Sequence, residues 1–234
     1  MDLEPGPMMR WLARRLDPSR PTGLWLSVGA ALAGFLSIAE DLPLAGDTLV
    51  VTVHTAAAAL VLAALGRWRR AVVLIATVAT AAGVSEVLKG VFDRPRPPAA
   101  AALIALPSNA SFPSGHAIAT LALYGGIALM VILDATGVRA RVAAGGTVAL
   151  AAIAVGVSRV YLGVHWPSDV VASWLLGTVV LCAAGWVAVA WVRSGALADA
   201  GGGLSAGWRL AVTAVAVLSG VVVLVVETWR YPLV

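Results

Sequence analysis

The longest apolar stretch of the chain, VVASWLLGTVVLCAAGWVAVAWV at residues 170–192, decides the fold class. It contains no Asp, Glu, Lys or Arg. A helix needs about 20 such residues to cross the hydrocarbon core of a bilayer. Six further apolar runs lie at residues 24–39, 49–65, 71–88, 117–133, 142–157 and 210–226. The sequence therefore predicts an all-α, polytopic transmembrane bundle of seven helices.

The composition excludes a soluble globular domain. Of the 234 residues, 60% are hydrophobic and 12% are charged, whereas a soluble domain carries about 25% charged residues. The mean hydropathy is +0.93. The net charge is +4, but the basic residues are dispersed, which argues against a nucleic-acid partner and for basic loops beside a membrane bilayer. Cys182 is the only cysteine, so internal disulfide bonds are excluded and a cysteine-based metal site is not expected.

The polar segments divide the chain into four parts. Residues 1–23 form a leader with a basic amphipathic stretch, which we expect at the cytoplasmic membrane surface. Residues 24–192 hold the first six helices, residues 193–209 form a cytoplasmic linker, and residues 210–234 hold the seventh transmembrane helix and the C-terminus. A cleavable signal peptide is the alternative for the first run, because Ser37-Ile38-Ala39 resembles a cleavage site. The long polar leader argues against that alternative.

The basic residues also predict the orientation in the membrane. With a cytoplasmic N-terminus, eleven of the sixteen fall in cytoplasmic segments: Arg10, Arg14, Arg15, Arg20, Arg67, Arg69, Arg70, Arg139, Arg141, Arg193 and Arg209. The five outside are Lys89, Arg94, Arg96, Arg159 and Arg230. Cytoplasmic loops carry the excess of Lys and Arg in membrane proteins. We therefore expect a multi-pass protein of the plasma membrane with its N-terminus in the cytoplasm.

Three polar clusters share the face predicted to be periplasmic or exterior. KGVFDRPRP at residues 89–97 follows the third apolar run, and PSGH at 113–116 precedes the fourth. SRVYLGVHWPSD at 158–169 joins the fifth and sixth. Charged groups close to a membrane are costly and usually functional. The cations, histidines and carboxylate that converge at these helix ends fit phosphoryl transfer.

The first role in such a site is to bind a phosphoryl group. Lys89, Arg96 and Arg159 can surround it, because guanidinium groups match its oxygens in geometry. Ser114 and Gly115 begin a helix, where free backbone N–H groups and the positive end of the helix dipole favour an anion. Glycine also lets the backbone approach the anion closely.

The second role is to react with the phosphoryl group. His165 lies ahead of a helix that Pro167 can start, and Asp169 follows four residues later. The carboxylate can hold one imidazole nitrogen and leave the other directed at phosphorus. His116 can then protonate the leaving oxygen.

Together, the clusters resemble the signature of the type 2 phosphatidic acid phosphatase superfamily, which includes lipid phosphate phosphatases and vanadium haloperoxidases. The signature reads K-x6-R-P, P-S-G-H and S-R-x5-H-x3-D. Its fixed positions match Lys89, Arg96, Pro97, Pro113, Ser114, Gly115, His116, Ser158, Arg159, His165 and Asp169. The resemblance covers about residues 89–169. It implies that residues 24–192 form the family's six-helix core and that the seventh helix is an addition to this core.

The resemblance implies a metal-independent phosphatase without a cofactor. His165 would attack phosphorus to form a phosphohistidine, Asp169 would orient His165, and His116 would protonate the leaving group. The implied phosphate ligands are Lys89, Arg96, Ser114, Gly115 and Arg159. No role is carried over to Asp93 or Arg94, which lie at non-signature positions.

Several questions stay open at this level. We expect the substrate to be a lipid phosphomonoester or pyrophosphate: polyprenyl pyrophosphate, phosphatidylglycerophosphate, phosphatidate or a polyprenyl-phosphosugar phosphate. A phosphotransferase, a vanadate-dependent haloperoxidase and a lipid or anion transporter are weaker alternatives, and the oligomeric state is undetermined. Glu86 either pairs with Lys89 or contacts a head group. His54, inside the second run, matches no motif and is interpreted as a packing or hydrogen-bonding residue.

Overall fold

The computed structural model describes residues 47–134 and 137–195. Within these residues the elements are α3 (Thr48–Ala64), α4 (Trp68–Phe92), the short 3-10 helix η2 (Ala99–Ala101), α5 (Gly115–Asp134), α6 (Val138–Tyr161) and α7 (Pro167–Arg193). They form no strand, which confirms the predicted all-α class. The leader, the first and seventh apolar runs and nearly all of the linker lie outside the described residues, so the predictions for them stay predictions.

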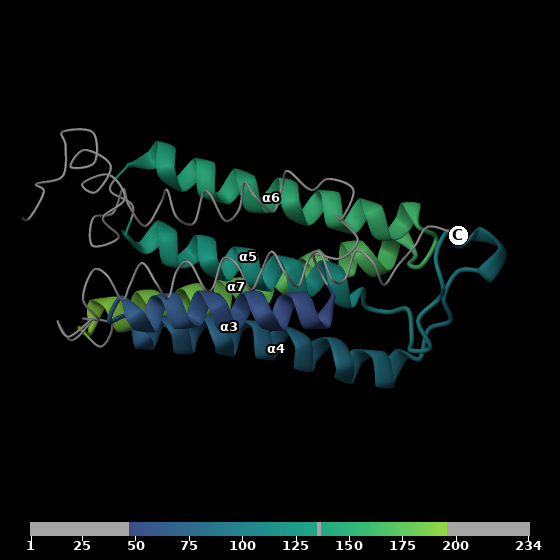
Figure 1. The fold of residues 1–234 in the computed structure, drawn as a ribbon, viewed down its shortest axis with the longest axis horizontal. Coiled ribbons are helices and arrows are strands. Elements are labelled where there is room, and N and C mark those ends of the chain that lie inside the picture. The colour runs from purple at the N-terminus through teal and green to yellow at the C-terminus, as the bar shows by residue number, and fades with distance from the viewer. Residues whose placement is uncertain (1–46, 135–136, 196–234) are drawn as a thin grey trace, which may run out of the picture.

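The five long helices run side by side as a bundle (Figure 1). Helix α5 packs against α3, α4, α6 and α7. Its fully buried residues include Leu123, which packs with Val155 of α6, and Ile118, which packs with Ala81 of α4. The core therefore follows α5 along the bundle.

Glycines allow the helices to approach one another closely. A Cβ on Gly156 of α6 would lie 2.4 Å from the ring of Trp174, and one on Gly125 of α5 would lie 2.4 Å from a methyl group of Leu181. Both partners belong to α7. Small residues at such contacts are typical of membrane helices, which associate by close packing rather than by the hydrophobic effect.

The outer surface of the bundle is apolar. Helices α4, α6 and α7 are long and apolar enough to cross a membrane, while α3 and Gly115–Met130 are shorter apolar helices. Leu150 of α6 and Val179 and Trp186 of α7 are more than 60% exposed. Apolar side chains of this size have no favourable environment in water, so their exposure fits contact with lipid.

The segment between α4 and α5 projects beyond the helices at one end of the bundle (Figure 1). It is attached to the turn between α6 and α7, since the Leu103 N–H donates to the Leu162 carbonyl over 3.0 Å. Next to that contact, Gly163 has a φ of +71°, and a Cβ there would lie 2.1 Å from the Ala101 carbonyl oxygen. Only glycine fits this position, because it tolerates a positive φ and leaves room for the loop backbone.

Gly163→Ala should lower the free energy of unfolding by about 1–3 kcal/mol, because it combines a left-handed backbone with a steric clash. The thermal unfolding midpoint in detergent measures the effect. Gly145→Ala in α6 is the matched control, since a Cβ there meets nothing within 4 Å. Equal midpoints for the two variants would show that the close approach of the loop does not constrain the structure.

Candidate active site

The site residues predicted from the sequence lie at one end of the bundle. Here α4 and α6 end, and α5 and α7 begin (Figure 1). Lys89 and Arg159 lie in the last turns of α4 and α6. Ser114, Gly115 and His116 lie at the start of α5, His165 and Asp169 at the start of α7, and Arg96 in the loop after α4. All eight candidates thus share one end, although the chain separates the first from the last by 80 residues.

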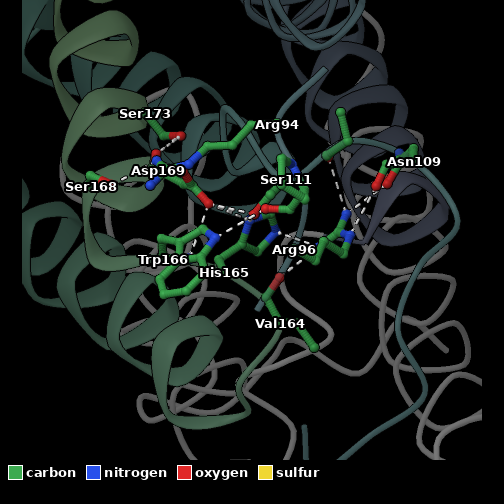
Figure 2. Close-up of polar contacts among 12 residues, drawn as sticks. Arg94, Arg96, Asn109, Ser111, Val164, His165, Trp166, Ser168, Asp169 and Ser173 are labelled. Atoms are coloured by element: carbon green, nitrogen blue, oxygen red, sulfur yellow. Dashed lines mark hydrogen bonds and ion pairs between the residues drawn. The ribbon is translucent and has the colours of Figure 1, made fainter. Parts of the chain in front are cut away.

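Arg96 joins the projecting segment to His165 (Figure 2). Its Nε donates to the Asn109 carbonyl over 2.9 Å, and its Nη2 donates to the Asn109 side-chain oxygen over 2.6 Å. Its Nη1 donates to the Val164 carbonyl over 2.8 Å and lies 3.3 Å from Nε2 of His165. Because a guanidinium can only donate hydrogen bonds, Nε2 faces Arg96 with its lone pair.

Asp169 is fully buried and accepts hydrogen bonds on both oxygens (Figure 2). Oδ1 accepts from Arg94 Nη1 over 2.6 Å. Oδ2 accepts from the Ser111 hydroxyl over 2.5 Å and from the Trp166 backbone N–H over 3.0 Å. The Trp166 contact also caps the first turn of α7. The carboxylate therefore closes the helix end and attaches both ends of the segment between α4 and α5 to it.

The contact between His165 and Asp169 is less direct than the four-residue spacing suggests. Nδ1 of His165 lies 3.6 Å from Oδ2 of Asp169, which is too long for a hydrogen bond. The Ser111 hydroxyl lies 3.5 Å from the same Nδ1 and donates to the same Oδ2. The structure thus places the carboxylate beside the imidazole, with Ser111 in contact with both.

The start of α5 lies beside Lys89 and two buried serine hydroxyl groups. A Cβ on Gly115 would lie 3.5 Å from Lys89 Nζ and 3.9 Å from the hydroxyl oxygen of Ser85. The hydroxyl groups of Ser85 and Ser114 are buried and have no hydrogen-bond partner among the described residues. Buried polar groups are normally satisfied, so two orphaned hydroxyls at a helix N-terminus fit an anion that would accept from them.

Lys89 donates to Glu86 over 2.9 Å. This is the ion pair that the sequence left as one of two possibilities for Glu86. The Glu86 side chain is 69% exposed, and an exposed pair of this kind contributes little stability. Lys89 can therefore exchange Glu86 for a phosphoryl oxygen at low cost.

His116 lies close to the other candidate residues. In the first turn of α5, His116 interacts electrostatically with Arg159, His165, Lys89 and Arg96, so it belongs to the same cluster.

Among the described residues, no group of three or more His, Cys, Asp or Glu side chains is placed to hold a metal ion. The donor set is instead cationic and suits an anion.

The sequence did not identify four of the contacting residues: Ser85, Arg94, Asn109 and Ser111. Asn109 and Ser111 precede the PSGH cluster by a few positions, but small polar residues are ordinary in loops. Ser85 lies one turn before Lys89 on α4. Because residues four apart share a helix face, this spacing could have indicated that Ser85 lies beside Lys89. Arg94 stands inside the first cluster without a signature position.

His54 lies apart from these contacts. Its Nδ1 hydrogen-bonds to the Val50 carbonyl within α3 over 2.7 Å. This agrees with the interpretation of His54 as a hydrogen-bonding residue.

Comparison with known proteins yields three similarities. The sequence pattern of the PAP2 superfamily matches residues 70–193. An undecaprenyl-diphosphatase from Sulfolobus acidocaldarius is 37% identical over 76 residues, which is 31% of this chain and 31% of that protein. The match thus covers less than a third of that relative's length. A crystal structure of a transmembrane PAP2 type phosphatidylglycerolphosphate phosphatase from Bacillus subtilis aligns with a TM-score of 0.53 and 21% identity, over 76% of this chain and 91% of that chain. At this identity the alignment shows a common transmembrane fold.

His165 should be neutral at pH 7. Burial and the charge of Arg96 lower its pKa below 6.5, although Asp169 acts in the opposite direction. The imidazole should therefore gain its proton only below pH 6.5, which NMR of the ring nitrogens can follow, with His165→Asn to assign the signal. Arg96→Gln should raise the pKa, because it removes a nearby positive charge. A midpoint above 6.5 in the unchanged protein, or a lower one in Arg96→Gln, would contradict this electrostatic picture.

Proposed function

The chain belongs to the PAP2 superfamily, and on that premise we propose that it is an integral membrane phosphatase acting on a lipid phosphate. The observation that carries the proposal is the environment of His165. Its Nδ1 side faces the buried carboxylate of Asp169, and its Nε2 faces the guanidinium of Arg96. A neutral imidazole is suited to attack a phosphoryl group when a carboxylate lies on one side of it and the cations that bind the phosphate lie on the other.

Hydrolysis would proceed in two displacements at phosphorus. His165 Nε2 attacks phosphorus, the bond to the lipid oxygen breaks, and His116 donates its proton to that oxygen. Water then attacks the phosphohistidine while His116 takes a proton from it, which releases inorganic phosphate and restores His165. Lys89, Arg96, Arg159 and the start of α5 would stabilise the charge on the phosphoryl oxygens.

The substrate is proposed to be a phosphomonoester or pyrophosphate of a lipid. The two relatives support this class, since one is named for undecaprenyl diphosphate and the other for phosphatidylglycerolphosphate. The site lies at the helix ends of an apolar bundle. A head group can therefore enter while its acyl or prenyl chains remain in the bilayer.

Phosphate release from a panel of lipid phosphates and pyrophosphates in detergent tests the function. We expect release with at least one of them, without an acceptor and in the presence of EDTA, because the site offers cations rather than carboxylates to the phosphoryl group. An absolute need for an acceptor would indicate a phosphotransferase. An absolute need for a divalent cation would contradict the metal-independent mechanism.

Substitutions of the reacting groups complete this test. His165→Ala should abolish release, and Asp169→Asn should lower kcat by several orders of magnitude, because the carboxylate and Ser111 together orient the imidazole. Asp93→Asn is the matched control for charge removal, because Asp93 is exposed and Asn tolerates its left-handed φ of 36°. Near-normal turnover in folded His165→Ala would refute the assignment of the nucleophile.

We further propose that the site faces the periplasm or the cell exterior and that the protein lies in the plasma membrane. The excess of basic residues in the opposite loops supports this orientation. In a Cys182→Ser background, Ala100→Cys in the projecting segment should react with an impermeant maleimide on intact cells. Arg67→Cys, in the turn between α3 and α4, should react only after lysis. The reverse pattern would place the chemistry in the cytoplasm.

A further inference from the structure

Arg94 contacts the catalytic candidates although the signature assigns it no role. Its Nη1 donates to Asp169 Oδ1 over 2.6 Å and to the Ser168 hydroxyl over 2.8 Å. Its guanidinium carbon also lies 5.7 Å from the centre of the Trp166 ring, in a cation–π contact. All three partners belong to the start of α7 or directly precede it, so Arg94 is fixed to the helix end that carries Asp169.

Asp169 needs such a partner because it is fully buried. A buried carboxylate is tolerated only when its charge is compensated and its oxygens accept hydrogen bonds. Ser111 and the Trp166 N–H supply neutral donors to Oδ2. Arg94 supplies a permanent positive charge to Oδ1.

Arg94 and Arg96 lie on different sides of the imidazole (Figure 2). Arg96 approaches Nε2 of His165, the nitrogen directed at phosphorus in the proposed mechanism. Arg94 approaches Asp169, on the Nδ1 side. Pro95 between them is pinned as well, since its carbonyl accepts from the Trp166 indole N–H over 3.0 Å. The segment is thus held in a way that separates the two cations.

We propose that Arg94 is a positioning residue that acts on the reaction through Asp169. It compensates the buried carboxylate and fixes its orientation, and the carboxylate with Ser111 fixes the ring of His165. The effect on turnover rests on the proposed function, whereas the ion pair itself does not. The competing role is direct binding of substrate phosphate, in which Arg94 would act on affinity rather than on turnover.

Steady-state kinetics of Arg94→Gln and Arg94→Lys separate these two roles. Arg94→Gln should lower kcat by about 10- to 100-fold, as loss of a residue that orients a reacting group does. KM and inhibition by vanadate, an analogue of the phosphoryl group, should change little, because the residues proposed to bind phosphate are unchanged. Arg94→Lys should recover most of the turnover, and Asp93→Asn should behave as the unchanged protein. An unchanged kcat, or a raised KM with weaker vanadate inhibition, would overturn the proposal.

A double-mutant cycle with Asp169→Asn tests whether Arg94 acts through the carboxylate. If it does, adding Arg94→Gln to Asp169→Asn should cause no further loss of residual turnover, since coupled residues are not additive. Multiplied losses in the double variant would mean that Arg94 acts independently of Asp169, and the proposal would fail.

Thermal unfolding of the unchanged protein, Arg94→Gln, Asp169→Asn and the double variant gives a readout that does not need activity. Arg94→Gln alone leaves a buried carboxylate without its cation and should lower the unfolding midpoint. Adding Asp169→Asn removes the charge and should raise the midpoint again. If the unchanged protein hydrolysed none of the lipids, the proposed function would fail, and this cycle would still decide the ion pair. If the losses of stability in the two single variants were additive in the double variant, the coupling between Arg94 and Asp169 would be refuted.

Discussion

The buried carboxylate of Asp169 is the constraint on which this end of the molecule depends. It accepts from Arg94 and Ser111 of the segment between α4 and α5, and from the backbone N–H that begins α7. Its own backbone carbonyl accepts from the Ser114 N–H at 3.4 Å, at the start of α5. A buried carboxylate is tolerated only when its charge is compensated and its oxygens accept hydrogen bonds. The packing of the loop and the arrangement of the catalytic candidates therefore depend on the same residue.

Hydropathy alone predicted the helices well, and its errors have a physical cause. The run at 49–65 corresponds to α3 at Thr48–Ala64, and the run at 170–192 to α7 at Pro167–Arg193. The run at 71–88 underestimates α4, which reaches Phe92. Hydropathy follows contact with lipid, whereas a helix is defined by its backbone hydrogen bonds and continues into the polar interface.

The order of the three clusters predicted which residues meet, but not how they touch one another. Alternating helices bring Lys89, Ser114 and His165 to one end whatever the loops do. The hydrogen bonds of Arg96 to Asn109 and of Asp169 to Ser111 depend instead on the path of a loop without periodicity. No spacing rule encodes such a path. This is why the sequence predicted a direct contact between His165 and Asp169 and did not predict the serine that touches both.

The surroundings of the two arginines explain how one short segment can serve two purposes. The hydrogen bonds of Arg96 run to neutral groups, the Asn109 side chain and the carbonyls of Asn109 and Val164. These bonds fix its position without cancelling its charge, so the charge remains available to an anion. Arg94 has a carboxylate as its partner, which neutralises it locally. A buried anionic partner would compete with phosphate for Arg96, whereas the neutral dipoles that hold it do not. Lys89 avoids the same competition in another way, because its partner Glu86 is exposed to solvent.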